Sequence, residues 1–232
     1  MEENIFWLNE PEGYTSLETG SWNTMLHPQI AERVNLHNPS TYLDYGCGGA
    51  KLDLLLNPSI PVDIYDISSD MLNEAEKNLG SRLHQRYDNK EDIPHNHYEM
   101  VVSSLMLMCI DNYEDYKGAI AKMYDCLVPQ GQAIIALTHP CFRQYPYSDF
   151  QADYTQRSFD YFQEGEAFEV KIQDSKSEIA FTDFHWSLGL TINTMIQCGF
   201  VIEEMVEVGD DPKKAGANAH FAPYMMICLR RG

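Results

Sequence analysis

Positive charge is scarce in this sequence. Only 16 Lys and Arg residues stand against 35 Asp and Glu residues, which gives the 232-residue chain a formal net charge of −19. An acidic surface repels phosphate backbones and anionic lipid. The close basic pairs, Lys213 with Lys214 and Arg230 with Arg231, are too small to form an evident basic groove. The charge therefore disfavours nucleic acid as a substrate.

Long apolar runs and a basic leader are also missing. No stretch approaches the ~20 consecutive apolar residues that a membrane helix needs. The first residues, MEENIFWLNEPEG, are acidic where a signal or transit peptide would be basic. We therefore expect a cytoplasmic protein with no membrane partner.

The cysteines and histidines lack the spacing of a metal site or a disulfide framework. No C-x-x-C pair occurs among Cys47, Cys109, Cys126, Cys141, Cys198 and Cys228. His95 and His97 in PHNHY alternate as a metal pair could, but no third ligand is near in the sequence. We interpret both as loop residues and expect no bound metal.

What the chain does contain is a regular alternation of apolar β-type segments and helix-like segments. The predicted strands are 41–45, 62–67, 83–87, 98–105 and 132–138, with helices at 51–56, between the cap Ser68 or Ser69 and Gly80, and at 113–127. An aromatic-rich insert, a helix at 187–198 and strands at 201–208 and 221–229 follow. This order predicts an α/β fold with a doubly wound, mostly parallel sheet and helices on both faces.

We predict a single domain over residues 1–232. Its parts are an N-terminal helical or lid segment (1–40), a cofactor-binding core (41–138), a substrate-lid insert (139–183) and a C-terminal part of the core (184–232). The core would be long enough to bury a proper hydrophobic interior.

A glycine-rich turn follows the first strand in TYLDYGCGGAKL. In a wound parallel sheet the ligand binds at the carboxyl ends of the strands. Glycines there permit a tight turn and close approach of a flat, adenosine-like ligand. A dinucleotide site would need a third glycine at position 51, where Lys51 stands, whereas Asp66 could bind the ribose of either type of cofactor. A turn without any ligand is the alternative.

Two consecutive segments, YLDYGCGGAKLDLLL and VDIYDISSDMLNEAEKNLG, resemble the first two motifs of class I S-adenosylmethionine-dependent methyltransferases. The resemblance continues through NKEDIP, YEMVVSSLMLMCI, CLVPQGQAIIALTHP and, more loosely, DFHWSLGLTINTMIQCGFVIEEMVE. The sequence departs from the family at Ala50 and at Gln130, where glycine is usual. The resemblance implies a Rossmann-like, seven-stranded sheet with S-adenosylmethionine as cofactor and S-adenosylhomocysteine as product.

The resemblance also implies roles for individual residues. Asp44 and the turn Gly46, Cys47 and Gly48 would hold the amino acid end of the cofactor, and Asp66 the ribose, with Ile67 beside it as a further cofactor-binding residue. Asp88 or Asn89 would bind the adenine amine. Ser104 would lie near the sulfonium.

Methyl transfer from such a cofactor is an in-line displacement, for which the enzyme supplies alignment and a dry pocket. A general base is needed only if the acceptor arrives protonated. His139, just past the fifth strand, and His185, in FHW, are the candidates. For each of them, a purely structural hydrogen bond to backbone is the alternative.

We expect the acceptor site in the segments that are not part of the wound α/β core, which are the N-terminal segment and the insert. Trp7, Tyr14 and Trp22 near the N-terminus, with Tyr145 and Tyr147 in the insert, are the candidate substrate-binding residues, unless these rings form the core of the lid itself. Within the insert, FEVKI and EIAFTDF predict a hairpin turning at about Ser175 and Lys176. Arg143 and Arg157 could pair with a carboxylate or phosphate of the substrate, or with neighbouring acids.

The sequence thus predicts an enzyme that methylates an oxygen or nitrogen atom of a small molecule, as a monomer or homodimer. Two alternatives stay open. The acceptor could be a peptide, a protein or RNA, or the chain could bind the cofactor without catalysis.

Overall fold

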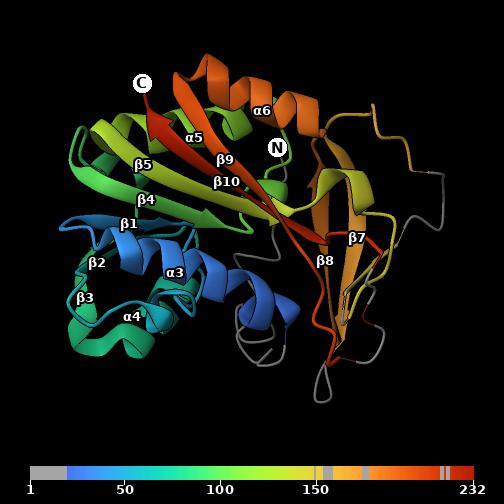
Figure 1. Cartoon of the computed structure of the whole chain (residues 1–232), viewed down its shortest axis with the longest axis horizontal. Coiled ribbons are helices and arrows are strands. Elements are labelled where there is room, and N and C mark those ends of the chain that lie inside the picture. The colour runs from blue at the N-terminus through green and yellow to red at the C-terminus, as the bar shows by residue number, and fades with distance from the viewer. Residues whose placement is uncertain (1–19, 149, 154–158, 174–177, 215–216, 218–219) are drawn as a thin grey trace.

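The computed structural model describes residues 20–148, 150–153, 159–173, 178–214, 217 and 220–232 (Figure 1). Its main sheet has seven strands in the order β3-β2-β1-β4-β5-β10-β9. The strands are β1 (Tyr42–Tyr45), β2 (Val62–Tyr65), β3 (Leu83–Tyr87), β4 (Tyr98–Ser104), β5 (Leu127–Thr138), β9 (Phe200–Val208) and β10 (Tyr224–Arg231). The first five are parallel, and β10 runs antiparallel between β5 and β9. The predicted seven-stranded, mostly parallel sheet is confirmed.

Helices cover both faces of this sheet. They are α3 (His27–His37), α4 (Ser69–Leu79), α5 (Tyr113–Cys126) and α6 (Leu188–Gln197). Figure 1 shows α3 and α4 on one face and α5 and α6 on the other. Successive residues of β1 supply the two cores in turn, because side chains alternate along a strand. Tyr42 is buried in the α3/α4 core, and Leu43 is buried in the α5/α6 core.

Helix α4 shows why the second wound unit forms where the sequence predicts it. The Ser68 hydroxyl accepts a hydrogen bond from the Met71 amide at 3.3 Å, and Asp70 lies in the first turn. Gly80 ends the helix with a φ of +54°. The apolar positions Met71, Leu72, Ala75 and Leu79 are all buried. The helix therefore packs one face on the sheet.

The chain enters α3 through a π-helical turn at Trp22–Leu26. In a π-turn each backbone hydrogen bond joins residues that are five apart in the sequence, whereas in an α-helix it joins residues four apart. Residues five apart, such as Trp22 and His27, consequently lie on nearly the same side. The remaining short helical turns are 3₁₀: η2 (Asp53–Leu55), η3 (Gly80–Arg82), η4 (Lys90–Asp92), η5 (Leu107–Cys109) and η6 (Pro140–Phe142).

A second, antiparallel sheet lies beyond the carboxyl ends of the parallel strands (Figure 1). It contains β6 (Phe150–Asp153), β7 (Glu166–Gln173) and β8 (Glu178–His185). The predicted hairpin is β7–β8, and its predicted turn residues Ser175 and Lys176 lie outside the described residues. Val170, Ile172, Ile179 and Phe181 join the same buried cluster as Tyr224 and α3. The small sheet is thereby packed directly onto the core.

Two strands begin three or more residues away from their predicted starts, and the other boundaries agree within two residues. Strand β5 begins at Leu127, before the predicted residue Gln132, and its ladder with β4 skips from the pair Tyr98–Leu127 to the pair Met100–Gln132. The skipped residues include Gln130, with a φ of +66°, so the early part of the strand is irregular. Strand β10 begins at Tyr224, directly after Pro223, which has no amide hydrogen to donate.

Candidate active site

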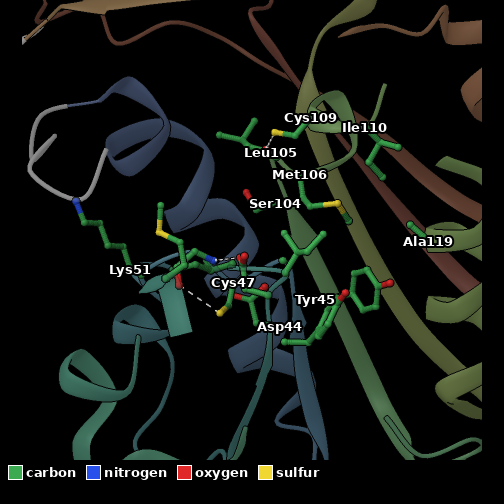
Figure 2. A pocket seen from close by; sticks show the side chains of 18 of the residues that line it. Asp44, Tyr45, Cys47, Lys51, Ser104, Leu105, Met106, Cys109, Ile110 and Ala119 are labelled. Carbon is green, nitrogen blue, oxygen red and sulfur yellow. Dashed lines mark hydrogen bonds between the residues drawn. The ribbon is translucent and has the colours of Figure 1, made fainter. Parts of the chain in front are cut away.

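A cavity of about 360 Å³ opens at the carboxyl ends of β1, β2 and β4 (Figure 2). This is the position where wound α/β sheets bind ligands, and the volume is in the range of small-molecule sites. Its walls come from the N-terminal helical turn, the glycine turn after β1, the tip of β2, the loop after β4 and the start of α5. They are Trp22, His27, Asp44, Tyr45, Gly46, Cys47, Gly48, Gly49, Lys51, Leu52, Tyr65, Asp66, Ile67, Met71, Lys90, Ser104, Leu105, Met106, Cys109, Ile110, Asp111, Asp115 and Ala119.

The glycine turn owes its shape to two positions with left-handed backbone. Gly46 has a φ of +81°, and a Cβ there would meet the Met106 Cγ at 2.5 Å. Gly48 has a φ of +52°, and a Cβ there would find no atom within 4 Å. Since Gly48 lines the cavity, the missing side chain leaves room for a ligand against the backbone. Glycine is therefore needed at position 46 because a side chain would collide with Met106, and at position 48 because a side chain would enter the cavity.

Asp66 at the tip of β2 connects this turn to α4. Its carboxylate accepts hydrogen bonds from the Gly48 and Ser68 amides, each at 2.9 Å. Burial raises the pKa of Asp66, and these backbone donors oppose the rise. Each carboxylate oxygen can accept more than one hydrogen bond, so ligand hydroxyls can still bind. Next to it, Ile67 is 65% exposed and lines the cavity, which offers an apolar wall for a flat base.

Asp44 is almost fully buried at the end of β1, and its Oδ1 has no donor among the described residues. Burial, and then repulsion from the Asp53 carboxylate, raise the pKa of Asp44 well above its ordinary value. Burial likewise raises the pKa of Asp53 to about 6. Two carboxyl groups can hydrogen-bond to each other only when one is protonated. A cation next to Asp44 would reverse its shift and complete its contacts.

The polar lining of the cavity is dominated by acids. Asp44, Asp66, Asp111 and Asp115 contribute carboxylates, against the two amines of Lys51 and Lys90. The Ser104 hydroxyl at the end of β4 is buried and has no hydrogen-bond partner within the described chain. This balance suits a ligand with positive charge and hydroxyl groups better than one with a pyrophosphate.

The structure brings most of the predicted cofactor residues into this one cavity. Asp44, Gly46, Cys47, Gly48, Asp66, Ile67 and Ser104 all line it, as does the predicted substrate residue Trp22. Figure 2 shows Asp44, Cys47 and Ser104 around the same space. Trp7 and Tyr14 lie outside the described residues.

Asp88 and Asn89 are not among the residues that line the cavity. The Asp88 carboxylate is held by Arg86, with an Nη2 to Oδ1 distance of 2.6 Å, and the Asn89 side chain caps η4 by accepting from the Glu91 amide at 3.1 Å. Lys90, the next residue, does line the cavity. The contact of Asp88 or Asn89 with adenine stays a prediction.

The two candidate bases differ in their contacts. His139 Nδ1 accepts from the Cys141 amide at 3.2 Å, so the neutral ring carries its proton on Nε2, which donates to Glu207 at 3.1 Å. Both nitrogens are thereby used, and the structural interpretation fits His139. His185 Nε2 donates to the Tyr161 carbonyl at 2.9 Å, and its buried Nδ1 has no partner within the described structure. The lone pair of His185 therefore stays available for a proton.

Tyr145 and Tyr147 lie outside the cavity wall. Tyr147 is 2% exposed and packs against Tyr224, with ring centroids 5.4 Å apart, as part of the core. Tyr145 is 46% exposed and lies against Phe221 at 5.4 Å. For Tyr147 the structure fits the alternative that the rings form a core, and an acceptor contact of either residue stays a prediction.

Several cavity residues were not predicted. The loop that leaves β4 supplies Met106, Cys109, Ile110 and Asp111, and α5 supplies Asp115 and Ala119. The position of the loop residues could have been predicted from the sequence, because a loop that follows a parallel strand begins at the edge of the sheet where ligands bind. The position of His27 could not, because only the π-turn places it on the same side as Trp22.

His27 gives the stability of the protein a specific pH dependence. Burial, and then the charge of Lys51, lower its pKa to about 4. Between pH 4 and 6.5 the unfolded chain binds a proton at this position that the folded chain does not, so His27 destabilises the fold increasingly as the pH falls. We expect the stability of His27→Gln relative to wild type to rise by up to ~1.4 kcal/mol per pH unit lowered in this window. Urea unfolding at several pH values measures it, and a constant difference would contradict the assignment.

No helix among the described residues is both long enough and apolar enough to cross a membrane. No group of three or more His, Cys, Asp or Glu side chains among them is placed to hold a metal ion.

Comparison with known proteins gives the fold and a domain match over part of the chain. A family model described as a methyltransferase domain matches residues 43–131, which span the glycine turn, Asp66 and Ser104. Residues 43–131 match a methyltransferase domain. The match agrees with the resemblance found in the sequence, and the predicted enzyme class is confirmed.

One protein similar in sequence and two structural neighbours can be compared with this chain. An uncharacterised protein of Haemophilus influenzae is 27% identical over 190 residues, or 74% of this chain and 72% of its own. The CcbJ methyltransferase of Streptomyces caelestis is 12% identical, with a TM-score of 0.71 and full coverage of both chains. The N-methyltransferase NodS of Bradyrhizobium japonicum, solved with S-adenosylhomocysteine, is 11% identical, with a TM-score of 0.64 over 95% of this chain and 92% of its own.

Proposed function

We propose that this methyltransferase binds S-adenosylmethionine in the cavity and transfers the methyl group to an oxygen or nitrogen atom of a small molecule. The observation that carries the proposal is the buried Asp44, whose unpartnered oxygen lies at the wall of a cavity that also contains Asp66 and Ser104. An ammonium group beside Asp44 would stabilise its carboxylate. The residues present fit this cofactor.

Each of the three residues would have a distinct task. Asp44 would hold the ammonium group, and Asp66, already fixed by two backbone amides, would accept from the ribose hydroxyls. Ser104, at the end of β4, would donate its unpartnered hydroxyl near the reacting end. The cofactor supplies a methyl carbon activated by positive sulfur. The chain supplies alignment and exclusion of water, which can account for roughly 7–11 kcal/mol of the barrier.

NAD fits this site less well than S-adenosylmethionine. Four carboxylates line the cavity, and a pyrophosphate would be repelled by them. Lys51 also replaces the third glycine of the dinucleotide fingerprint. NodS, a structural neighbour, was solved with S-adenosylhomocysteine, which supports the same class of ligand here.

Calorimetric titration of the purified protein with S-adenosylhomocysteine, with NAD as the control, tests cofactor binding. We expect micromolar binding of the former and none of the latter. Binding of NAD alone, or of neither compound, would contradict the proposal. Transfer of a labelled methyl group into a small-molecule extract tests the acceptor class. Incorporation into protein or RNA instead would refute the small-molecule assignment, and binding without any transfer would refute catalysis.

A further inference from the structure

Arg143 is a buried cation for which the described residues supply no acceptor to Nε or Nη1. It follows η6, past the carboxyl end of β5, and is only 2% exposed. Its Nε and Nη1 have no acceptor in the part of the chain that the structure describes, and its guanidinium lies 5.4 Å from the centroid of the Phe168 ring. Buried polar groups in native proteins are nearly always hydrogen-bonded, and a buried charge without such bonds is costly. The arrangement therefore points to an anionic partner that binds here.

The second sheet presents a polar end to Arg143. Phe168 and Asp183 are cross-strand partners, and so are Glu166 and His185. Because alternate residues of a strand share a face, these four side chains lie on the buried side of the sheet. All four are less than a tenth exposed. The rest of this face is apolar, so the polar groups are confined to one end.

Cys109 connects this polar end to the cofactor cavity. Its Sγ donates to the Asp183 carboxylate at 3.9 Å, and the same residue lines the cavity. The Arg143 charge opposes the rise that burial causes in the pKa values of Cys109 and Asp183, and it adds to the lowering that burial causes in the pKa of His185. Arg143 therefore lies within electrostatic reach of all three. Arg143 is thus placed behind the cavity wall, on the side of the lid sheet.

We propose that Arg143 binds the carboxylate of the methyl acceptor, which makes the acceptor a small carboxylic acid. This inference rests on the proposed function and specifies its substrate class. A guanidinium matches a carboxylate with two parallel hydrogen bonds. A phosphate dianion fits less well, because one cation stands among the acids Asp183 and Glu166, which would repel the second charge.

The nearby acids do not replace this partner in the structure. Asp183 makes no hydrogen bond with Arg143, and burial raises its pKa to about 7. At neutral pH it is consequently protonated about half of the time. Arg143 therefore keeps a positive charge that a ligand carboxylate can compensate.

The test uses benzoate, with benzamide as its neutral counterpart, on the full-length protein with and without saturating S-adenosylhomocysteine. We expect calorimetry to show that benzoate binds to the wild type at least tenfold more tightly than benzamide. Arg143→Met should lose this preference, and Arg143→Lys, which keeps the charge but not the planar fork, should weaken it. Arg33→Met, which removes an ion pair between α3 and Glu204 of β9, should bind benzoate as the wild type does.

Thermal unfolding without ligand gives an independent reading. Replacing an unpaired buried charge with an apolar side chain should not destabilise the protein, so Arg143→Met should melt at the same or a higher temperature than wild type. A clearly lower melting temperature, or failure to fold, would show that Arg143 already pairs with Asp183 or Glu166 and would overturn the inference. Equal binding of benzoate and benzamide, or no binding, would do so as well. Failure of S-adenosylhomocysteine to bind would instead count against the proposed function.

Discussion

Gly48→Leu is expected to abolish binding of S-adenosylhomocysteine while the protein still folds. A Cβ at Gly48 meets no atom within 4 Å, so the new side chain would project into the cavity rather than into the core. Its left-handed backbone, with a φ of +52°, adds a strain of about 1–2 kcal/mol. We expect at least a hundredfold loss of affinity in calorimetric titration, together with a modest fall in melting temperature.

Gly80 provides a matched control for this variant. It has a φ of +54°, a Cβ there would also meet nothing within 4 Å, and it ends α4 away from the cavity. Gly80→Leu should therefore also be strained, because a φ of +54° disfavours any side chain, and it should bind S-adenosylhomocysteine normally. If the two variants bind the ligand equally well, the cavity at Gly48 is not the cofactor site.

The second large effect is expected from Asp66→Ala. The change removes the acceptor for the ribose hydroxyls and also the acceptor of the Gly48 and Ser68 amides, so the glycine turn loses its fixed shape. We expect the affinity for S-adenosylhomocysteine to fall more than tenfold. The loss of two backbone contacts should also lower the free energy of unfolding by ~1–3 kcal/mol.

Asp70→Ala is the control, since Asp70 is an exposed acid in the first turn of α4 and does not line the cavity. Its affinity for S-adenosylhomocysteine should match that of the wild type in the same calorimetric assay. Near-normal affinity of Asp66→Ala would refute the role assigned to Asp66, whatever the change in its stability.

The local parts of the fold and site could be predicted from the sequence. Ser68 and Gly80 bound α4 because capping depends on residues within one turn. Gly46, Gly48 and Asp66 lie together because each ends a neighbouring parallel strand or begins the turn after it. Once the alternation of strands and helices is recognised in the sequence, the order of these elements is enough to place the three residues at the same edge of the sheet.

Features that depend on long-range contacts could not be predicted in this way. Arg143 contacts the ring of Phe168, on a strand whose packing against the core no local pattern specifies. The contact of Cys109 with Asp183 joins residues from the cofactor core and the second sheet. His139 looked like a base from its place after β5, and its contact with Glu207 became visible only in the folded chain.

The π-helical turn at Trp22–Leu26 makes the length of this segment matter as much as its composition. Deleting one residue would let the segment wind as a regular α-helix, in which Trp22 and His27 would be four apart and still face the same side. Inserting one residue would instead put them six apart, where neither an α-helix nor a π-turn sets them on the same side. Both line the cavity, so such an insertion would reshape its wall without any substitution in the parallel sheet. Among descendants of a common ancestor, a single-codon insertion here could therefore redirect the choice of ligand while the rest of the gene stays unchanged.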